Sequence, residues 1–415
     1  MSEKVILAYS GGLDTSVAVR WLTVERGYDV IALTVDVGLD RDRATLEERA
    51  LAAGAVGYRW LDAREDFIRY FAFPAMMAGA RYQGRYPLAT ALARPLIAKL
   101  MVDVAREEGA QAVAHGCTGK GNDQVRFDVS VQALAPDLRI VAPLREWDLR
   151  TRESEIEYAQ QHNIPVPVTK ASPYSIDENL WGRSIESGPL EDPWTEPPED
   201  AFAWTRSIAN APDEPRNVEV EFKRGVPISL DGDELDPVAL TQRMNELAGE
   251  HGVGRIDHLE DRLVGIKSRE VYESPGAVTL LAAHDALEQM TLSKAQIRLK
   301  ASIAQEYAEL IYNGLWFTAH HQDLAHYVHS TQRHVSGTVR MRLHKGQATP
   351  TGTKSPRSLY AFALATYEEG DQYDSSAAEG FIKVFGLPAV TQAQAQLLPE
   401  HDDTMRIAAP PEDEP

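Results

Sequence analysis

The 415-residue sequence contains one cysteine, Cys117, and no long apolar run. A single cysteine excludes a framework of internal disulfide bonds and is typical of proteins in a reducing compartment. No segment approaches the roughly 18 consecutive apolar residues that a membrane-spanning helix requires. Strand-forming residues begin at Lys4, which leaves no room for a signal peptide. The sequence therefore predicts a cytoplasmic protein with no membrane partner.

Positive charge is scarce, because 42 lysine and arginine residues are outnumbered by 62 aspartate and glutamate residues, which gives a formal net charge of −20. Such a chain repels a phosphate backbone at long range, so we expect no nucleic-acid partner. Small anions such as ATP are compatible with this charge, since local amides and a few cations can bind phosphate within one pocket. Acids and prolines gather near the C-terminus, and we expect residues 391–415 to form a disordered, solubilising tail.

Two common phosphate-binding patterns are also missing. The sequence has no GxxxxGK[ST], because the nearest glycine spacing, Gly116 to Gly121, is followed by Asn122-Asp123. It has no GxGxxG after its first strand either. Any nucleotide site must therefore use a different loop.

The first 165 residues alternate strand-like and helix-like segments. Strands are expected at 5–10, 29–38, 57–63, 111–116 and 137–143, and helices at 16–27, 43–55, 64–76, 91–109 and 151–163. This alternation is typical of an α/β fold with a doubly wound parallel sheet. If the strand order is 3-2-1-4-5, the first and fourth strands are neighbours at the point where the order reverses.

The regular alternation of strand-like and helix-like segments ends after residue 168. Residues 187–216, rich in proline and acids, indicate a connecting loop, and a strand pair at 218–230 precedes a helix at 236–252. A short helix is expected at 375–388. We therefore predict a nucleotide-binding domain at 1–167, a second α+β domain at 168–362, a C-terminal helical segment at 363–390 and the tail at 391–415.

The stretch AYSGGLDTS, residues 8–16, follows the apolar run VIL at the end of the first expected strand. The next helix offers unpaired N–H groups at its N-terminus, and Gly11 and Gly12 allow phosphate to approach bare backbone. Asp14 would repel a naked phosphate, so its presence indicates Mg²⁺. The alternative is a plain glycine turn in which Asp14 caps the helix. A second loop, HGCTGKGNDQVRFD at 115–128, follows the fourth expected strand, so the two loops would face one site.

The first loop resembles the SGGxDS pyrophosphate loop of the ATP pyrophosphatases. Together with GRYPLATALARP (84–95), SPYSIDENLWGRSIE (172–186) and GIKSREVYESPGA (265–277), the sequence from about residue 4 to 388 is similar to the argininosuccinate synthase family. The resemblance implies that ATP activates citrulline as citrullyl-AMP and that the aspartate amine displaces AMP to give argininosuccinate, a step of arginine biosynthesis. It also implies that the second domain is a synthetase domain and that the C-terminal segment serves oligomerisation in a homotetramer.

Site residues follow from the same resemblance. ATP would be bound by Ala8, Tyr9, Ser10, Gly11, Gly12, Leu13, Asp14, Thr15, Ser16, Val35 and Gly116. Citrulline would be bound by Tyr86, Ala91, Asn122, Arg126, Ser175, Ser184, Glu260 and Tyr272, and aspartate by Thr118, Asn122 and Asp123. Ala91 stands where the family commonly has a serine, so one hydroxyl contact to citrulline is lost.

The expected chemistry depends on positioning and on charge. Asp14 would act on the pyrophosphate through Mg²⁺, Arg94 would stabilise the departing pyrophosphate, and Asp123 would orient the aspartate amine. Arg126 can bind a carboxylate with two hydrogen bonds, and Glu260 can accept from an ammonium group. Cys117 has no expected catalytic role.

Two other functions are open at this point. One is another AMP-forming ligase of the asparagine, GMP or tRNA-modifying type, although the glutaminase domain of the first two is missing and the acidic charge disfavours tRNA. The other is a nucleotide-binding regulator without catalysis, which the retention of the candidate site residues disfavours. Release of AMP and pyrophosphate that depends on citrulline and aspartate would distinguish all three.

Overall fold

The computed structural model describes residues 2–39, 41–149, 151–165 and 173–400. The chain divides into two compact units, Met1–Leu359 and Tyr360–Pro415. The boundary that we expected between residues 167 and 168 and the tail residues 401–415 lie outside the described residues. The boundary between a nucleotide-binding and a second domain therefore stays a prediction.

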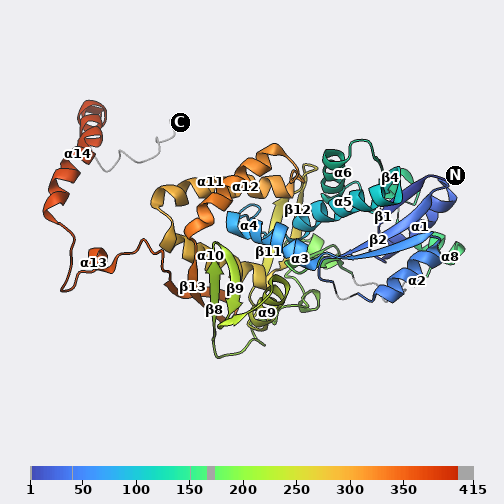
Figure 1. Ribbon diagram of the computed structural model, residues 1–415, viewed down its shortest axis with the longest axis horizontal. Helices are drawn as coiled ribbons and strands as arrows, with labels where there is room; N and C mark the ends of the chain where they lie inside the picture. The colour runs from blue at the N-terminus through green and yellow to red at the C-terminus, as the bar shows by residue number, and fades with distance from the viewer. Residues whose placement is uncertain (1, 40, 150, 166–172, 401–415) are drawn as a thin grey trace. The chain divides into compact units, whose positions relative to one another are not determined.

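The first sheet of the larger unit is parallel and has the order β3-β2-β1-β4-β5, the order under which the two loops were expected to be neighbours. Figure 1 labels β1, β2 and β4 of this sheet. Its strands are β1 (Lys4–Ala8), β2 (Asp29–Asp36), β3 (Gly57–Asp62), β4 (Ala112–Ala114) and β5 (Arg139–Val141). The helices around it are α1 (Leu13–Val24), α2 (Arg43–Ala53), α5 (Ala89–Glu108), α6 (Asp123–Leu134), α7 (Pro143–Glu146) and α8 (Arg152–Gln161). The sequence analysis treated residues 115–128 as a loop and did not predict α6.

Helices cover both faces of this sheet, because its strands are apolar on both faces. Val5 and Leu7 belong to a core shared with α1, α2 and α8, whereas Ile6 between them belongs to the core on the α5 face. Successive side chains of a strand point to opposite faces, so a continuous apolar strand needs cover on each side. The doubly wound arrangement is therefore confirmed. Pro95 lies inside α5 and is buried in it.

Two antiparallel sheets complete the unit, as predicted for an α+β part. One has the order β10-β9-β8-β13-β14, and the other the order β11-β12-β7-β6. The strands are β6 (Ser175–Asn179), β7 (Gly182–Glu186), β8 (Arg216–Lys223), β9 (Val226–Leu230), β10 (Asp233–Glu234), β11 (Arg255–Asp261), β12 (Lys267–Glu273), β13 (Gly337–His344) and β14 (Gln347–Lys354). Residues 187–215 form a connection with two short 3₁₀ turns, η2 (Gly188–Glu191) and η3 (Glu199–Ala201).

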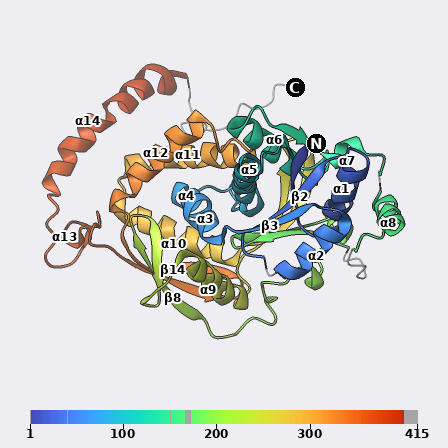
Figure 2. The same ribbon diagram turned by 45° about the vertical axis from the view of Figure 1, so that its right-hand side comes forward.

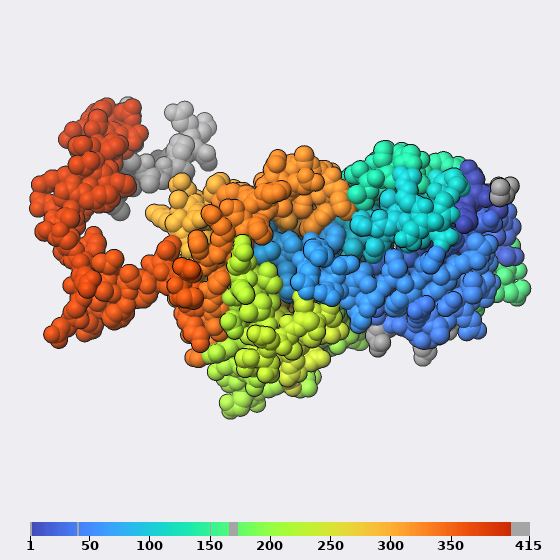
Figure 3. Space-filling model, in the orientation of Figure 1, coloured from blue at the N-terminus to red at the C-terminus, as the bar shows by residue number. Residues whose placement is uncertain are grey.

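Helices link the parallel sheet to the antiparallel part. Figures 2 and 3 show the orange helices α11 and α12 against the blue segment that holds α4, and their residues are in contact. The remaining helices are α3 (Arg64–Phe67), the π-helical η1 (Ile68–Ala72), α4 (Phe73–Ala78), α9 (Pro237–Glu250), α10 (Pro275–Thr291), α11 (Lys294–Tyr312), α12 (Ala319–Thr331) and the 3₁₀ turn η4 (Gln332–His334). None of the helices in the described ranges combines the length and the apolar composition that crossing a membrane demands.

The smaller unit contains α13 (Phe362–Ala365) and α14 (Ser376–Gln392). Helical structure continues through the π-helical η5 (Ala393–Leu397) and the 3₁₀ turn η6 (Leu398–Glu400). It thus extends about ten residues into the segment that we expected to be irregular from residue 391. Residues 393–397 alternate alanine, glutamine and leucine, which are good helix formers, and the acids and prolines of the tail come later.

Candidate active site

The loop after β1 has the geometry that close approach of an anion requires. Gly11 has φ +76°, and a Cβ there would lie 2.1 Å from Leu46 Cδ2, so only glycine fits. The hydroxyls of Ser10 and Thr15 lie 3.0 Å apart, and the Gly12 N–H points at the Ser10 hydroxyl at 3.4 Å. These groups surround the N-terminus of α1, where free N–H groups favour negative charge.

The second loop touches the first. A Cβ on Gly116 would lie 2.9 Å from Thr15 Cγ2, so the two loops pack together at the tips of β1 and β4. His115, buried at the end of β4, lies with Nε2 2.8 Å from Asp128 Oδ1 and receives the Cys117 N–H at Nδ1. Burial raises the pKa of the Cys117 thiol, which disfavours the thiolate that a nucleophilic role would need.

A polar face of the antiparallel sheet β11-β12-β7-β6 lies opposite the two loops. Ser184 on β7 pairs with Asp177 on β6 and with Tyr272 on β12. Because side chains two residues apart share a face, Glu186 and Glu270 lie on the same face as these three. All five side chains line one cavity of about 410 Å³ together with the strand tips of the parallel sheet.

A group of arginines and aspartates lies where the two parts meet. Arg94 donates from Nη2 to Asp123 Oδ2 at 2.7 Å and also pairs with Asp177, and Arg126 donates from Nη1 to Asp123 Oδ1 at 2.9 Å. Burial alone would raise the pKa of Asp123, but Arg94 and Arg126 outweigh it and hold the pKa of that carboxyl below its ordinary value. Burial raises the pKa of Asp177 despite Arg94.

Two arginine nitrogens in this group have no hydrogen-bond partner within the described ranges. They are Nη2 of Arg126 and Nε of Arg94, and both are buried. Burying a charged donor without a partner is costly, so such groups indicate where a ligand supplies the acceptor. Arg126 Nη2 therefore suits the carboxylate of an amino acid, but Nε and Nη1 already have protein acceptors, so the guanidinium does not have two free nitrogens for the paired hydrogen bonds expected from the sequence.

Most of the predicted site residues line this cavity. They are Ala8, Tyr9, Ser10, Thr15, Val35, Tyr86, Arg94, Gly116, Thr118, Asn122, Asp123, Arg126, Ser175, Ser184, Glu260 and Tyr272. Gly11, Gly12, Leu13, Asp14, Ser16 and Ala91 are not among its lining residues.

Burial or a contact elsewhere is found for three of the predicted residues that do not line the cavity. Ser16 Oγ hydrogen-bonds the Tyr9 hydroxyl at 3.1 Å, and Ala91 is fully buried in α5. Asp14, in the first turn of α1, interacts instead with Glu155 on α8. Burial and the charge of Asp14 raise the pKa of Glu155 to about 8. The carboxyl groups of Asp14 and Glu155 thus lie side by side at the loop of residues 8–16, called the glycine loop below.

The cavity also contains residues that the sequence analysis missed. Arg41 donates to the Ser10 carbonyl at 2.8 Å, and Tyr312 ends α11 beside Arg126. Nothing in their local sequence distinguishes either residue. Asp177, Glu186 and Glu270, by contrast, lie two residues from predicted site residues on β6, β7 and β12. These three strands were not predicted, and once they are recognised the period-2 pattern places the acids on the same face.

Glu270 makes folding stability depend on pH. Burial, followed by the charges of Glu186 and Glu260, raises its pKa to about 8, above the ordinary glutamate value near 4.3. Between these two values the folded state holds a proton that the unfolded state has lost, so the free energy of unfolding falls as pH rises toward 8. We expect Glu270→Gln to reduce this fall, measured as urea midpoints from pH 5 to 9. Parallel pH profiles of wild type and variant would contradict the assignment.

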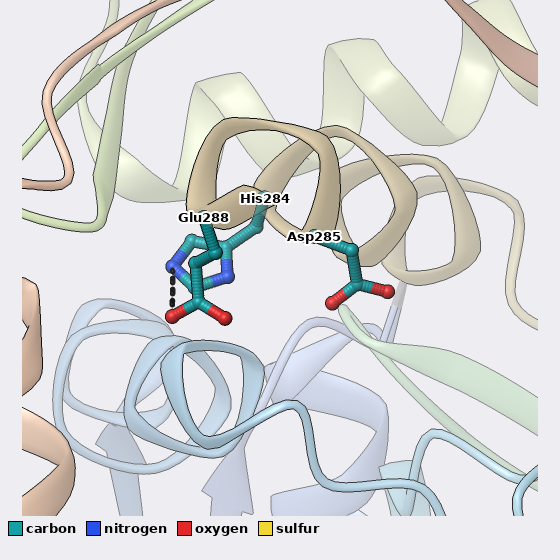
Figure 4. Close-up of side chains that lie close together, drawn as sticks. All are labelled: His284, Asp285 and Glu288. Atoms are coloured by element: carbon teal, nitrogen blue, oxygen red, sulfur yellow. Dashed lines mark ion pairs between the residues drawn. The ribbon is translucent and has the colours of Figure 1, made fainter. Parts of the chain in front are cut away.

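A separate acidic cluster lies on α10, outside the cavity. Ligand atoms of His284, Asp285 and Glu288 lie within 4.8 Å of one another (Figure 4). However, Lys300 Nζ lies 2.9 Å from Glu288 Oε2, and Arg81 Nη2 lies 2.6 Å from Asp285 Oδ2. These cations already neutralise both carboxylates, so the cluster is an ion-pair network that ties α10 to α11.

The fold and the cavity together define an α/β nucleotide-binding enzyme whose second, antiparallel part faces the glycine loop. Residues 4–165 match the family model of the arginosuccinate synthase N-terminal HUP domain, and residues 174–392 match that of the arginosuccinate synthase C-terminal domain. The chain belongs to the argininosuccinate synthase family, a family of ligases with ATP as a substrate.

Curated relatives agree with these matches over the whole chain. An argininosuccinate synthase of Dehalococcoides mccartyi is 58% identical over 402 residues, which is 97% of this chain and 99% of the relative. Argininosuccinate synthases of Symbiobacterium thermophilum and Listeria monocytogenes are each 55% identical, over 95% and 94% of this chain and 98% and 96% of the relatives.

Proposed function

We propose that this chain joins citrulline and aspartate into argininosuccinate, with conversion of ATP to AMP and pyrophosphate through citrullyl-AMP. The observation that carries the proposal is the single cavity in which the glycine loop, the second loop and the polar sheet face meet. ATP bound at the strand tips would direct its α-phosphorus at the amino acid bound on the polar sheet face. No residue needs to form a covalent bond with a substrate, because alignment supplies much of the rate, about 7–11 kcal/mol in favourable cases.

Different residues of the cavity bind the phosphates, the adenine and the two amino acids. Ser10, Thr15 and Gly116 bind the phosphates, and Val35 lies against the adenine. Arg126 binds an amino-acid carboxylate through its free Nη2, and Glu260 accepts from an ammonium group. Asp123, with a lowered pKa, stays ionised and orients the aspartate amine. In the first step the citrulline ureido oxygen attacks the α-phosphorus and pyrophosphate leaves, and in the second the aspartate amine attacks the activated carbon and AMP leaves with its bonding electrons.

Magnesium suits the acidic pair beside the loop. Asp14 and Glu155 offer hard carboxylate oxygens, which are the ligands that Mg²⁺ prefers, and burial together with the charge of Asp14 raises the pKa of Glu155, a shift that a bound cation would oppose. Bound there with the pyrophosphate, Mg²⁺ would neutralise its developing charge.

Asp14→Asn tests this role of the acidic pair. We expect kcat to fall by about 10²-fold, because stabilisation of the departing pyrophosphate weakens, and the Mg²⁺ concentration for half-maximal rate to rise. The measurement is a titration of initial rate with MgCl₂ at saturating substrates. Near-normal turnover of the variant at saturating Mg²⁺ would contradict the role of Asp14.

The activity itself is tested with labelled ATP. We expect release of AMP and pyrophosphate that requires both citrulline and aspartate, with one argininosuccinate formed per AMP. Release of AMP with glutamine or ammonia in place of aspartate would favour another AMP-forming ligase, and ATP binding without turnover would favour a regulator.

The proposal also includes a homotetrameric assembly and a cytoplasmic location. The apolar side chains of α14, among them Phe381 and Phe385, are more than half exposed in the single chain, and a patch of this kind marks an interaction surface. A homotetramer built through α14 would bury them, and a sedimentation mass of one chain would exclude it. The single cysteine favours the cytoplasm.

A further inference from the structure

Tyr312 holds a position in the cavity that none of the assigned roles explains. It is the last residue of α11, its side chain is buried, and it lies among the lining residues. The helix ends there because Gly314, at φ +74°, turns the chain against Arg126, where a Cβ would lie 2.7 Å from Arg126 Cα. The tertiary fold therefore brings this tyrosine against Asn122, Arg126 and Glu260, which lie 190, 186 and 52 positions away in the sequence.

The Tyr312 hydroxyl joins two binding residues directly. It accepts a hydrogen bond from Asn122 Nδ2 at 2.8 Å and donates its own proton to Glu260 Oε1. Asn122 Oδ1 accepts from the Leu263 N–H at 2.9 Å, and Glu260 Oε2 accepts from the Tyr272 hydroxyl at 2.6 Å. These bonds set which way the Asn122 carboxamide points: its oxygen accepts from the Leu263 N–H, and within the described ranges the Tyr312 hydroxyl is the acceptor of its NH₂ group.

The rest of Tyr312 fixes Arg126. Its carbonyl accepts from Arg126 Nε at 2.8 Å, and the guanidinium lies over its ring, 4.7 Å from the centroid. With Nε and Nη1 both engaged, only Nη2 of Arg126 remains for a ligand. The ring of Tyr312 is itself fixed, because it stacks on Tyr82 with centroids 3.5 Å apart and planes at 7°.

We infer that Tyr312 is a positioning residue that links the two amino-acid subsites, since its hydroxyl orients Asn122 and Glu260 together while its carbonyl and ring aim Arg126. The inference rests on the proposed function, and it assigns Tyr312 an effect on amino-acid binding and none on the nucleotide. The Glu260 carboxylate is 2% exposed, and both of its oxygens accept from phenols. A ligand ammonium therefore meets a carboxylate that is already held in place.

Tyr312→Phe tests the inference, because it removes the hydroxyl and keeps the ring, the stack on Tyr82 and the carbonyl. A hydrogen bond to a charged group is worth about 1.5–3 kcal/mol, so we expect the KM for citrulline to rise about 10- to 100-fold. The KM for aspartate should rise as well, because Asn122 loses its acceptor. The KM for ATP and the kcat at saturating substrates should stay within threefold of wild type. A general loss of structure would not raise the amino-acid KM values while leaving these two parameters unchanged.

Tyr82→Phe is the matched control. It removes the other hydroxyl of the same ring stack, which donates to the Asp261 carbonyl at 2.7 Å and does not line the cavity. We expect wild-type KM values for all three substrates in this variant. Equal thermal midpoints for both variants and wild type would show that the fold is intact.

A double-variant cycle separates positioning from folding. In a Glu260→Gln background, Tyr312→Phe should raise the KM for citrulline less than it does in the wild type, because the two residues act through one bond. Additive effects, or a Tyr312→Phe variant with unchanged amino-acid KM values, would overturn the inference. Failure of the proposed function would look different, since wild type would then release no AMP with citrulline and aspartate.

Discussion

Replacing Arg94 with methionine should lower kcat by about 10²- to 10³-fold, the loss that follows removal of one preorganised charge from a reacting site. Arg94 pairs with both Asp123 and Asp177, and its Nε has no partner within the described ranges. Burial would lower the pKa of Arg94, but the two aspartates outweigh it and raise the pKa, so the guanidinium stays charged. Without Arg94, the carboxylates of Asp123 and Asp177 face the cavity with less positive charge beside them and repel an anionic nucleotide.

The measurement is steady-state release of pyrophosphate, with Arg106→Met as the matched control. Arg106 lies on the same helix, α5, and pairs with Asp137 at the exposed surface. We expect the control to keep wild-type kinetics, because an exposed ion pair contributes little. A similar kcat in both variants would show that Arg94 has only a structural role.

Replacing Lys300 with methionine should cost about 3–5 kcal/mol of the free energy of unfolding, because it leaves Glu288 buried without a cation. Lys300 and Glu288 are 5% and 7% exposed, and their charged atoms lie 2.9 Å apart. Gln332 Nε2 donates to the other Glu288 oxygen at 2.7 Å, so the carboxylate cannot turn to solvent. The network joins α10, α11 and η4.

Urea unfolding checks this prediction against two controls. Lys99→Met removes the cation of an exposed pair with Asp103 and should cost no more than about 1 kcal/mol. A Lys300→Met/Glu288→Gln double variant should recover part of the loss, since it removes the unpaired charge as well. The network would not be a stability determinant if Lys300→Met and Lys99→Met unfolded at the same urea concentration.

Much of the active site was predictable because its residues lie in short local patterns. The glycine loop at 8–16 and the loop at 115–128 each follow an apolar strand, and the carboxyl ends of parallel strands meet at one edge. The order β3-β2-β1-β4-β5 made these two loops neighbours, and the contact between Gly116 and Thr15 agrees with that expectation. Helix α6 was missed because its apolar residues Val125, Phe127, Val129 and Val131 recur at every second position, which is not a helical spacing, and because a glycine-rich loop precedes it.

The sequence by itself determined the parallel sheet, the position of both loops and most of the candidate residues that line the cavity. All of these depend on alternation and on neighbours a few residues apart. Only the tertiary structure decided which distant groups complete the cavity: Asp177 opposite Arg94, Arg41 on the glycine loop, and Tyr312 between Asn122 and Glu260. The physical reason is that hydrogen bonds and ion pairs between residues 31 to 190 positions apart depend on how whole elements pack, and no local pattern carries that information.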